Sequence, residues 1–133
     1  MGRRATKITT WGTVALLAAA RAGVHTIEHG TYIDEAAGKA MRENGTILIP
    51  TLMAFQGIKQ RLGKGIYTPV VEDKVRAVAA FADTIVERAI MYDVKVAFGT
   101  DAGVFTHGLN AGELVLMRSA GMSDREALAS ATT

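Results

Sequence analysis

The stretch that decides the predicted fold is Val24-His25-Thr26-Ile27-Glu28-His29-Gly30. Its β-branched residues and closing glycine predict a short strand over residues 24–29. An Ala-rich helix is predicted before it, over residues 12–22, with Gly23 as the glycine that ends the helix. A second helix is predicted after it, from an N-cap at Asp34 to about Asn44, where Gly45 stops it. This strand therefore lies between two helices.

The rest of the chain continues the alternation of strands and helices. We predict strands over 46–49, closed by Pro50, and over 94–98, an amphipathic helix over 72–92, and helices over 111–119 and after Ser123, which forms a capping box with Glu126. Residues 53–70 hold three glycines and one proline and are predicted to be a long loop. Strands that alternate with amphipathic helices predict an α/β fold with a parallel sheet.

The composition narrows the possible functions. The 133 residues suit one domain, and 49% hydrophobic with 21% charged residues is typical of a globular protein. The absence of cysteine excludes a disulfide scaffold, a thiol nucleophile and cysteine-ligated metal. A formal net charge of +2 and 6% aromatic residues argue against a nucleic-acid partner. No apolar run reaches the ~18 residues of a membrane span, so we also expect no membrane partner.

The first twenty residues allow a second interpretation. Arg3 and Arg4 precede the apolar run 14–20, which resembles a weak signal peptide, and residues 1–6 fit the loose myristoylation pattern. A secreted or lipidated small protein is therefore an alternative. We favour a buried helix for the apolar run, and with it a cytoplasmic location.

The carboxyl ends of the three predicted strands carry the residues that can do chemistry. They read Glu28-His29-Gly30, Pro50-Thr51 and Gly99-Thr100-Asp101-Ala102-Gly103. Functional groups in parallel α/β folds lie at such ends. His29 and Asp101 are candidate ligands of a divalent cation, and Asp101 is also a candidate catalytic base. The alternative is a strand-end histidine and an aspartate that caps the next turn.

Three further side chains lie near His29 or Asp101 in the sequence. His25 shares a strand face with His29 but lies roughly 13 Å from the strand end, so we expect it to be structural or exposed. Glu28 is expected to point away from His29, because neighbours in a strand alternate between faces. His107, in the loop after Asp101, is a candidate substrate-binding or metal-binding residue, or a solvated loop histidine.

Two motifs resemble segments of the amidohydrolase superfamily. Residues 22–31, Ala22-Gly23-Val24-His25-Thr26-Ile27-Glu28-His29-Gly30-Thr31, resemble its sixth strand. Residues 98–103 with His107-Gly108 and Asn110-Ala111-Gly112-Glu113-Leu114 resemble its eighth strand and loop, and residues 121–132 resemble the helix that follows. The branch is imidazolonepropionase-like or Xaa-Pro-dipeptidase-like. The resemblance implies an α/β fold that is a partial (β/α)8 TIM barrel, roughly strands six to eight with flanking helices, within one domain over residues 1–133.

The resemblance also implies a chemistry. It implies one or two divalent metals, zinc in most members, held in part by His29 and Asp101, with Asp101 as the general base. The reaction is hydrolysis of an amide, cyclic amide or dipeptide carbon–nitrogen bond, so the implied substrate is a small or dipeptide-like molecule.

The sequence departs from the family pattern near its start. Residues 7–13 fall where the family's strand-five histidine is expected and contain no histidine, and residues 1–11 are atypical. A catalytic zinc normally takes three protein ligands, whereas two are identified here. We therefore expect the isolated chain to be inactive. The alternative is a non-catalytic α/β module that associates with a complementary barrel fragment or with itself.

Overall fold

A three-stranded parallel sheet is the centre of the fold. The computed structural model describes residues 6–10 and 12–132. Strands β1 (Lys7–Thr10), β2 (Thr26–His29) and β3 (Ile47–Ile49) lie in the order β1-β2-β3. Thr10 pairs with His29 across the β1–β2 ladder, and Thr26 pairs with Ile47 across the β2–β3 ladder. The carboxyl ends of the strands therefore share one edge.

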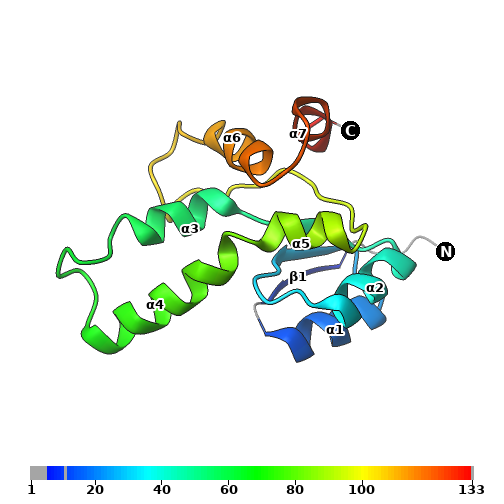
Figure 1. Ribbon diagram of the computed structural model, residues 1–133, viewed down its shortest axis with the longest axis horizontal. Coiled ribbons are helices and arrows are strands. Elements are labelled where there is room, and N and C mark those ends of the chain that lie inside the picture. The colour runs from blue at the N-terminus through cyan, green and yellow to red at the C-terminus, as the bar shows by residue number, and fades with distance from the viewer. Residues whose placement is uncertain (1–5, 11, 133) are drawn as a thin grey trace.

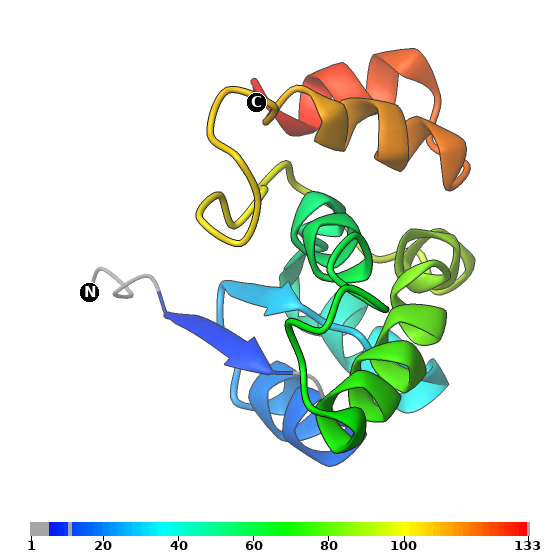
Figure 2. The ribbon, with the colours of Figure 1, turned by 90° about the vertical axis from the view of Figure 1, so that its left-hand side faces the viewer.

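Helices surround this sheet. Their bounds are α1 (Thr13–Arg21), α2 (Glu35–Asn44), α3 (Leu52–Lys59), α4 (Pro69–Ala82), α5 (Ile85–Met91), α6 (Gly112–Ser119) and α7 (Asp124–Ser130). Helices α1 and α2 lie at one end of the molecule, and α6 and α7 lie at the other (Figures 1 and 2). Helices α3 and α4 run side by side and extend past the sheet (Figure 1).

The main core lies between the sheet and helices α1 and α2. Leu16 and Ala20 of α1, Ile27 of β2 and Met41 of α2 are fully buried there. The apolar run 14–20 is thus part of helix α1, which confirms the helix interpretation of that run, although only one face of it is buried and Val14 is 83% exposed. Residues 1–5, which include Arg3, Arg4 and most of the myristoylation pattern, lie outside the described residues. In the part of the chain that the structure describes, no helix combines the length and apolar character needed to cross a bilayer.

Helix α3 corrects the prediction of a long loop over residues 53–70. The helix occupies the first part of that range, and its Leu52 and Phe55 are buried. Its glycine is explained by packing, because a Cβ on Gly57 would lie 2.9 Å from Cβ of Phe105 and 3.0 Å from the Val104 carbonyl oxygen. A neighbouring loop, not the local sequence, requires glycine here.

The predicted helix over 72–92 is two helices. Helix α4 begins earlier, at Pro69, and ends at Ala82, and α5 begins at Ile85. At the break, the carbonyl oxygen of Phe81 accepts bonds from the Thr84 hydroxyl at 3.0 Å and from Nη2 of Arg88 at 2.9 Å. The backbone N–H of Thr84 also donates to this oxygen at 3.1 Å, so backbone and side-chain donors together satisfy a carbonyl at the end of α4.

The prediction of a strand over residues 94–98 is also wrong, because the segment forms only one bridge to the sheet. Val96 forms a single parallel bridge with Leu48, through bonds from Leu48 N to the Lys95 oxygen (2.9 Å) and from Ala97 N to the Leu48 oxygen (2.8 Å). Phe98 N already donates to the Ser130 oxygen at 3.0 Å, so the segment turns toward α7. The third strand of the sheet is instead β1, which the predicted order of elements omits.

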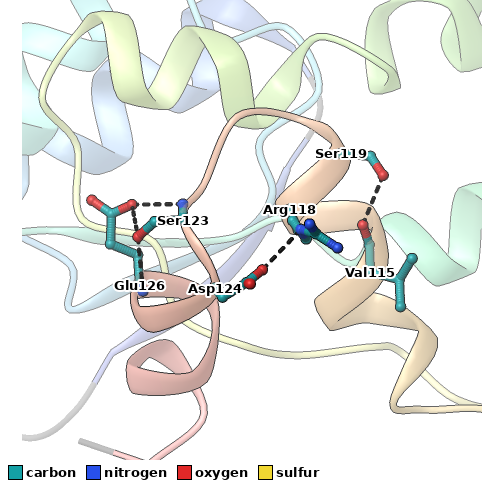
Figure 3. Close-up of polar contacts among 6 residues, drawn as sticks. All are labelled: Val115, Arg118, Ser119, Ser123, Asp124 and Glu126. Carbon is teal, nitrogen blue, oxygen red and sulfur yellow. Dashed lines mark hydrogen bonds and ion pairs between the residues drawn. The ribbon is translucent and has the colours of Figure 1, made fainter.

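The capping box at the last helix is confirmed. The Ser123 hydroxyl accepts from Glu126 N at 3.2 Å, and the Glu126 carboxylate accepts from Ser123 N at 2.8 Å (Figure 3). Arg118 of α6 forms an ion pair with Asp124 of α7 at 2.8 Å (Figure 3). The capping box closes the start of α7, and the ion pair joins α7 to α6.

Candidate functional site

A cavity opens at the carboxyl edge of the sheet. We call it the strand-end cavity, and its volume is about 290 Å³. Its lining residues are Lys7, Thr9, Glu28, His29, Ile49, Thr51, Phe98, Gly99, Thr100 and Asp101. The structure thus brings His29 and Asp101, the two predicted metal ligands, to one cavity although they lie far apart in the sequence.

The backbone at His29 leaves the extended conformation. Its φ is +67°, and the following Gly30 has a φ of +62°. Nδ1 of the ring lies 2.6 Å from Oγ1 of Thr51, and the ring packs edge-on to Phe55 with centroids 5.8 Å apart. Burial lowers the pKa of His29 below its ordinary 6.5, and this outweighs the raising effect of the Asp101 and Glu28 charges. A neutral imidazole is the form that binds a metal.

Asp101 stands on a similar turn. Its φ is +52°, and its side chain is exposed at the mouth of the cavity. Its carboxylate is close enough to His29 to raise the pKa of that ring. Thr100 before it is buried, and Val104 N returns to the Asp101 oxygen at 3.4 Å. The loop therefore presents the Asp101 carboxylate beside the imidazole.

Glu28 corrects the expectation that it points away from His29. Glu28 and His29 both line the strand-end cavity, because the left-handed backbone of His29 ends the alternation of the strand. The Glu28 side chain is only 9% exposed, and its Oε2 lies 3.6 Å from Nζ of Lys7. Its Oε1 is buried without a hydrogen-bond partner among the described residues. A buried, unpartnered carboxylate oxygen is costly unless a cation or a donor meets it.

The donor set agrees in type with a divalent cation. An imidazole nitrogen and carboxylate oxygens are ligands that zinc accepts, and Glu28, whose Oε1 has no hydrogen-bond partner among the described residues, lines the same cavity. Within residues 6–10 and 12–132, however, no three histidine, aspartate or glutamate side chains are clustered closely enough to hold a metal together. The residues present fit part of a metal site.

The other two histidines lie elsewhere. Nδ1 of His25 accepts the backbone N–H of Thr6 at 3.1 Å, which joins the segment before β1 to the start of β2 and confirms a structural role. His107 is exposed in the loop after Asp101 and is not one of the residues that line the strand-end cavity. Its substrate-binding role stays a prediction.

Two residues at the site were not predicted to have a role. Thr51 was identified only as a strand end, and its φ of +51° is unusual for a β-branched residue. Glu113 of α6 is fully buried, and its two carboxylate oxygens accept the backbone N–H groups of Leu52 and Met53, each at 2.7 Å. Burial raises the pKa of Glu113 to about 7. A glutamate in the first turn of a helix gives no sequence signal of such a contact.

Comparisons with known proteins agree with this arrangement. No family model matches the chain. An uncharacterised protein of Mycobacterium tuberculosis is 36% identical over 114 residues, which are 83% of this chain and 30% of that protein. The ochratoxinase of Aspergillus niger is 30% identical over 125 residues, which are 91% of this chain and 25% of that protein.

Solved structures share the fold. The crystal structure of a Xaa-Pro dipeptidase with bound methionine in its active site has a TM-score of 0.87 at 37% identity, over 95% of this chain and 31% of that one. The crystal structure of A. niger ochratoxinase has a TM-score of 0.82 at 28% identity, over 95% of this chain and 28% of that one. The chain therefore spans less than a third of the length of these matched proteins.

Proposed function

We propose that this chain, which is amidohydrolase-like in sequence and fold, is part of a metal-dependent hydrolase. That enzyme would cleave carbon–nitrogen bonds. Its parallel sheet would supply roughly strands six to eight of a (β/α)8 barrel. The observation that carries the proposal is the meeting of His29 and Asp101 in one cavity at the carboxyl edge of the sheet. Barrel enzymes of this class place their chemistry at that edge.

The two residues have separate roles in the proposal. His29 contributes an imidazole nitrogen and Asp101 a carboxylate oxygen to a divalent cation, with zinc as the expected ion. When bound, such a cation activates water and polarises the substrate carbonyl. The Asp101 carboxylate accepts a proton from the attacking water and delivers it to the leaving nitrogen, so a C–O bond forms as the C–N bond breaks.

The substrate class follows from the named relatives. A Xaa-Pro dipeptidase and an ochratoxinase are among the matched proteins, so we propose a small amide or dipeptide-like substrate. Because the described residues supply only part of a ligand set, we expect the isolated chain to be inactive. Robust zinc-dependent hydrolysis of dipeptides by the purified chain would contradict this expectation.

The test of the metal site is calorimetric titration of the purified chain with zinc. We expect binding that is weakened or lost in both His29→Ala and Asp101→Ala. His107→Ala is the matched control, because it removes an exposed histidine outside the strand-end cavity. Zinc binding that is indifferent to the first two substitutions, or no binding at all, would count against the proposed site in this chain.

A second candidate function rests on the edge of the sheet. Among the described residues, β1 forms a ladder with β2 alone, so one edge of the parallel sheet presents backbone donors and acceptors. Such an edge suits a non-catalytic module that joins a complementary barrel fragment or a second copy of itself. Analytical ultracentrifugation over a range of concentrations, with and without a chelator, separates the two ideas. Association that is independent of metal favours the module.

A further inference from the structure

We infer that Thr51 and Glu113 are positioning residues that hold the imidazole of His29 with its proton on Nδ1. The inference deepens the proposed function, and its value for metal binding rests on that function. The tautomer of the His29 ring is a property of this chain alone and is measured without metal.

The hydroxyl of Thr51 decides which ring nitrogen is protonated. Oγ1 of Thr51 donates its single hydrogen to the carbonyl oxygen of Pro50 at 2.8 Å. The same oxygen lies 2.6 Å from Nδ1 of His29 and has only lone pairs left for that contact. Nδ1 must then be the donor, and Nε2 carries the lone pair of the neutral ring.

The position of that hydroxyl depends on a strained backbone. Thr51 has φ +51° and ψ +47°, a left-handed conformation that a β-branched residue avoids. Such a conformation is disfavoured and persists only where the surroundings hold it. The hydroxyl therefore needs a second element to keep it against the ring.

Glu113 is that second element. Its carboxylate accepts from the N–H groups of Leu52 and Met53, the two residues directly after Thr51. The carboxylate thereby caps the start of α3, whose own N-cap residue makes no side-chain capping bond. Glu113 is fully buried, and a Cβ on Gly112 would lie 2.8 Å from Sδ of Met53, so α6 approaches α3 closely at this point.

Glu113 and Thr51 form a relay from α6, through the start of α3, to the His29 ring. Glu113 follows the Asp101 loop in the chain, and Thr51 contacts His29. Partners that orient a metal-binding histidine through its other ring nitrogen typically contribute 10–100-fold to metal affinity. Loss of the Thr51 hydroxyl should therefore weaken zinc binding by a factor in that range.

The direct test is the ¹⁵N chemical shift of the two ring nitrogens of His29, measured by NMR on the metal-free chain above the pKa of that ring. We expect the Nδ1–H tautomer in the wild type and in Thr51→Ser. We expect loss of that preference in Thr51→Val, which keeps the shape and removes the hydroxyl. Thr46→Val is the matched control, because it removes a buried hydroxyl that donates to the Val24 oxygen, away from His29.

The contribution of Glu113 is tested in the same experiment. Glu113→Gln keeps the size but offers one acceptor oxygen to two N–H groups, so we expect a mixture of tautomers. Glu126→Gln is the control, because it makes the same change at the exposed capping box of α7 (Figure 3). An unchanged tautomer in Glu113→Gln would remove Glu113 from the relay.

Two results would overturn the inference about Thr51. They are an Nε2–H ring in the wild type and an unchanged tautomer in a folded Thr51→Val. The wild-type measurement keeps the inference falsifiable even where Thr51→Val does not fold. Zinc titration of the same samples separates the two proposals. An Nδ1–H ring without zinc binding would contradict the metal site and leave the positioning role standing.

Discussion

The carboxylate of Glu113 accepts the backbone N–H of Leu52 at 2.7 Å, although 61 positions separate the two residues. The second oxygen accepts the N–H of Met53 at the same distance. One buried side chain thus satisfies two of the donors that an α-helix leaves open at its start. The stability of α3 is tied in this way to the docking of α6.

Removal of this carboxylate should destabilise the fold. We predict that Glu113→Ala lowers the free energy of unfolding by about 1–3 kcal/mol, because it leaves buried N–H groups of α3 without an acceptor. Urea denaturation followed by circular dichroism measures the change. Glu126→Ala should cost less, since the Ser123 N–H that it leaves open is exposed to water. Equal losses in the two variants would contradict the importance of the buried cap.

The same carboxyl group predicts a pH dependence of stability. Burial raises the pKa of Glu113 from an ordinary 4.5 to about 7, so the folded state holds this proton where the unfolded state has lost it. Its contribution to stability is full below pH 4.5 and falls as the pH rises to about 7, by on the order of 3 kcal/mol. We predict that Glu113→Gln removes this fall when unfolding is measured at several pH values. Parallel curves for both proteins would show that Glu113 titrates normally.

The pKa of His29 offers a test of the site geometry without metal. Burial lowers it below 6.5, while the Asp101 charge raises it. We predict an NMR titration midpoint below 6.5 in the wild type and a still lower one in Asp101→Asn. Asp124→Asn, at an exposed carboxylate on α7, should leave the midpoint unchanged. If Asp101→Asn had no effect, Asp101 would not lie beside the ring.

Gly57 should resist substitution although it lies within a helix. Alanine at an open helical position would stabilise by about 1 kcal/mol. At Gly57 its Cβ would lie 2.9 Å from Cβ of Phe105 and 3.0 Å from a backbone oxygen, so we predict a loss of about 1–3 kcal/mol in urea denaturation. Gly112→Ala is the comparison, because its nearest contact is the flexible side chain of Met53 and should cost less. A stabilised Gly57→Ala would mean that the loop can move away.

The elements that the sequence predicts well are those with local signals. β-branched runs mark the strands over 24–29 and 46–49. The helix from Asp34 to Asn44 is marked by its capping aspartate, which accepts from Ala37 N at 2.8 Å, and by the glycine that stops it. Helix α3 was missed because its cap comes from Glu113, far along the chain. At the break between α4 and α5, Arg88 donates to the Phe81 carbonyl oxygen, a contact that no local pattern reveals.

The candidate site also contains some residues that the sequence predicts and others that it does not. His29 and Asp101 could be predicted, because strand-end positions and family-like motifs mark them. The similarity to Xaa-Pro dipeptidase and ochratoxinase confirms the amidohydrolase resemblance that these motifs predict. The position of Glu28 could not be predicted, since alternation holds only while the backbone stays extended, and His29 departs from it. The role of Thr51 depends on a hydroxyl contact that exists only in the folded chain.

Three of the four described non-glycine residues with positive φ are His29, Thr51 and Asp101, and all three line the strand-end cavity. Glycine would adopt a positive φ at each of these positions with less strain, and asparagine would do so at positions 29 and 101. Substitution by glycine at any of the three positions would therefore relax the backbone and remove the functional side chain. The fold thus accepts a cost in stability at the three positions that place an imidazole, a hydroxyl and a carboxylate around this cavity.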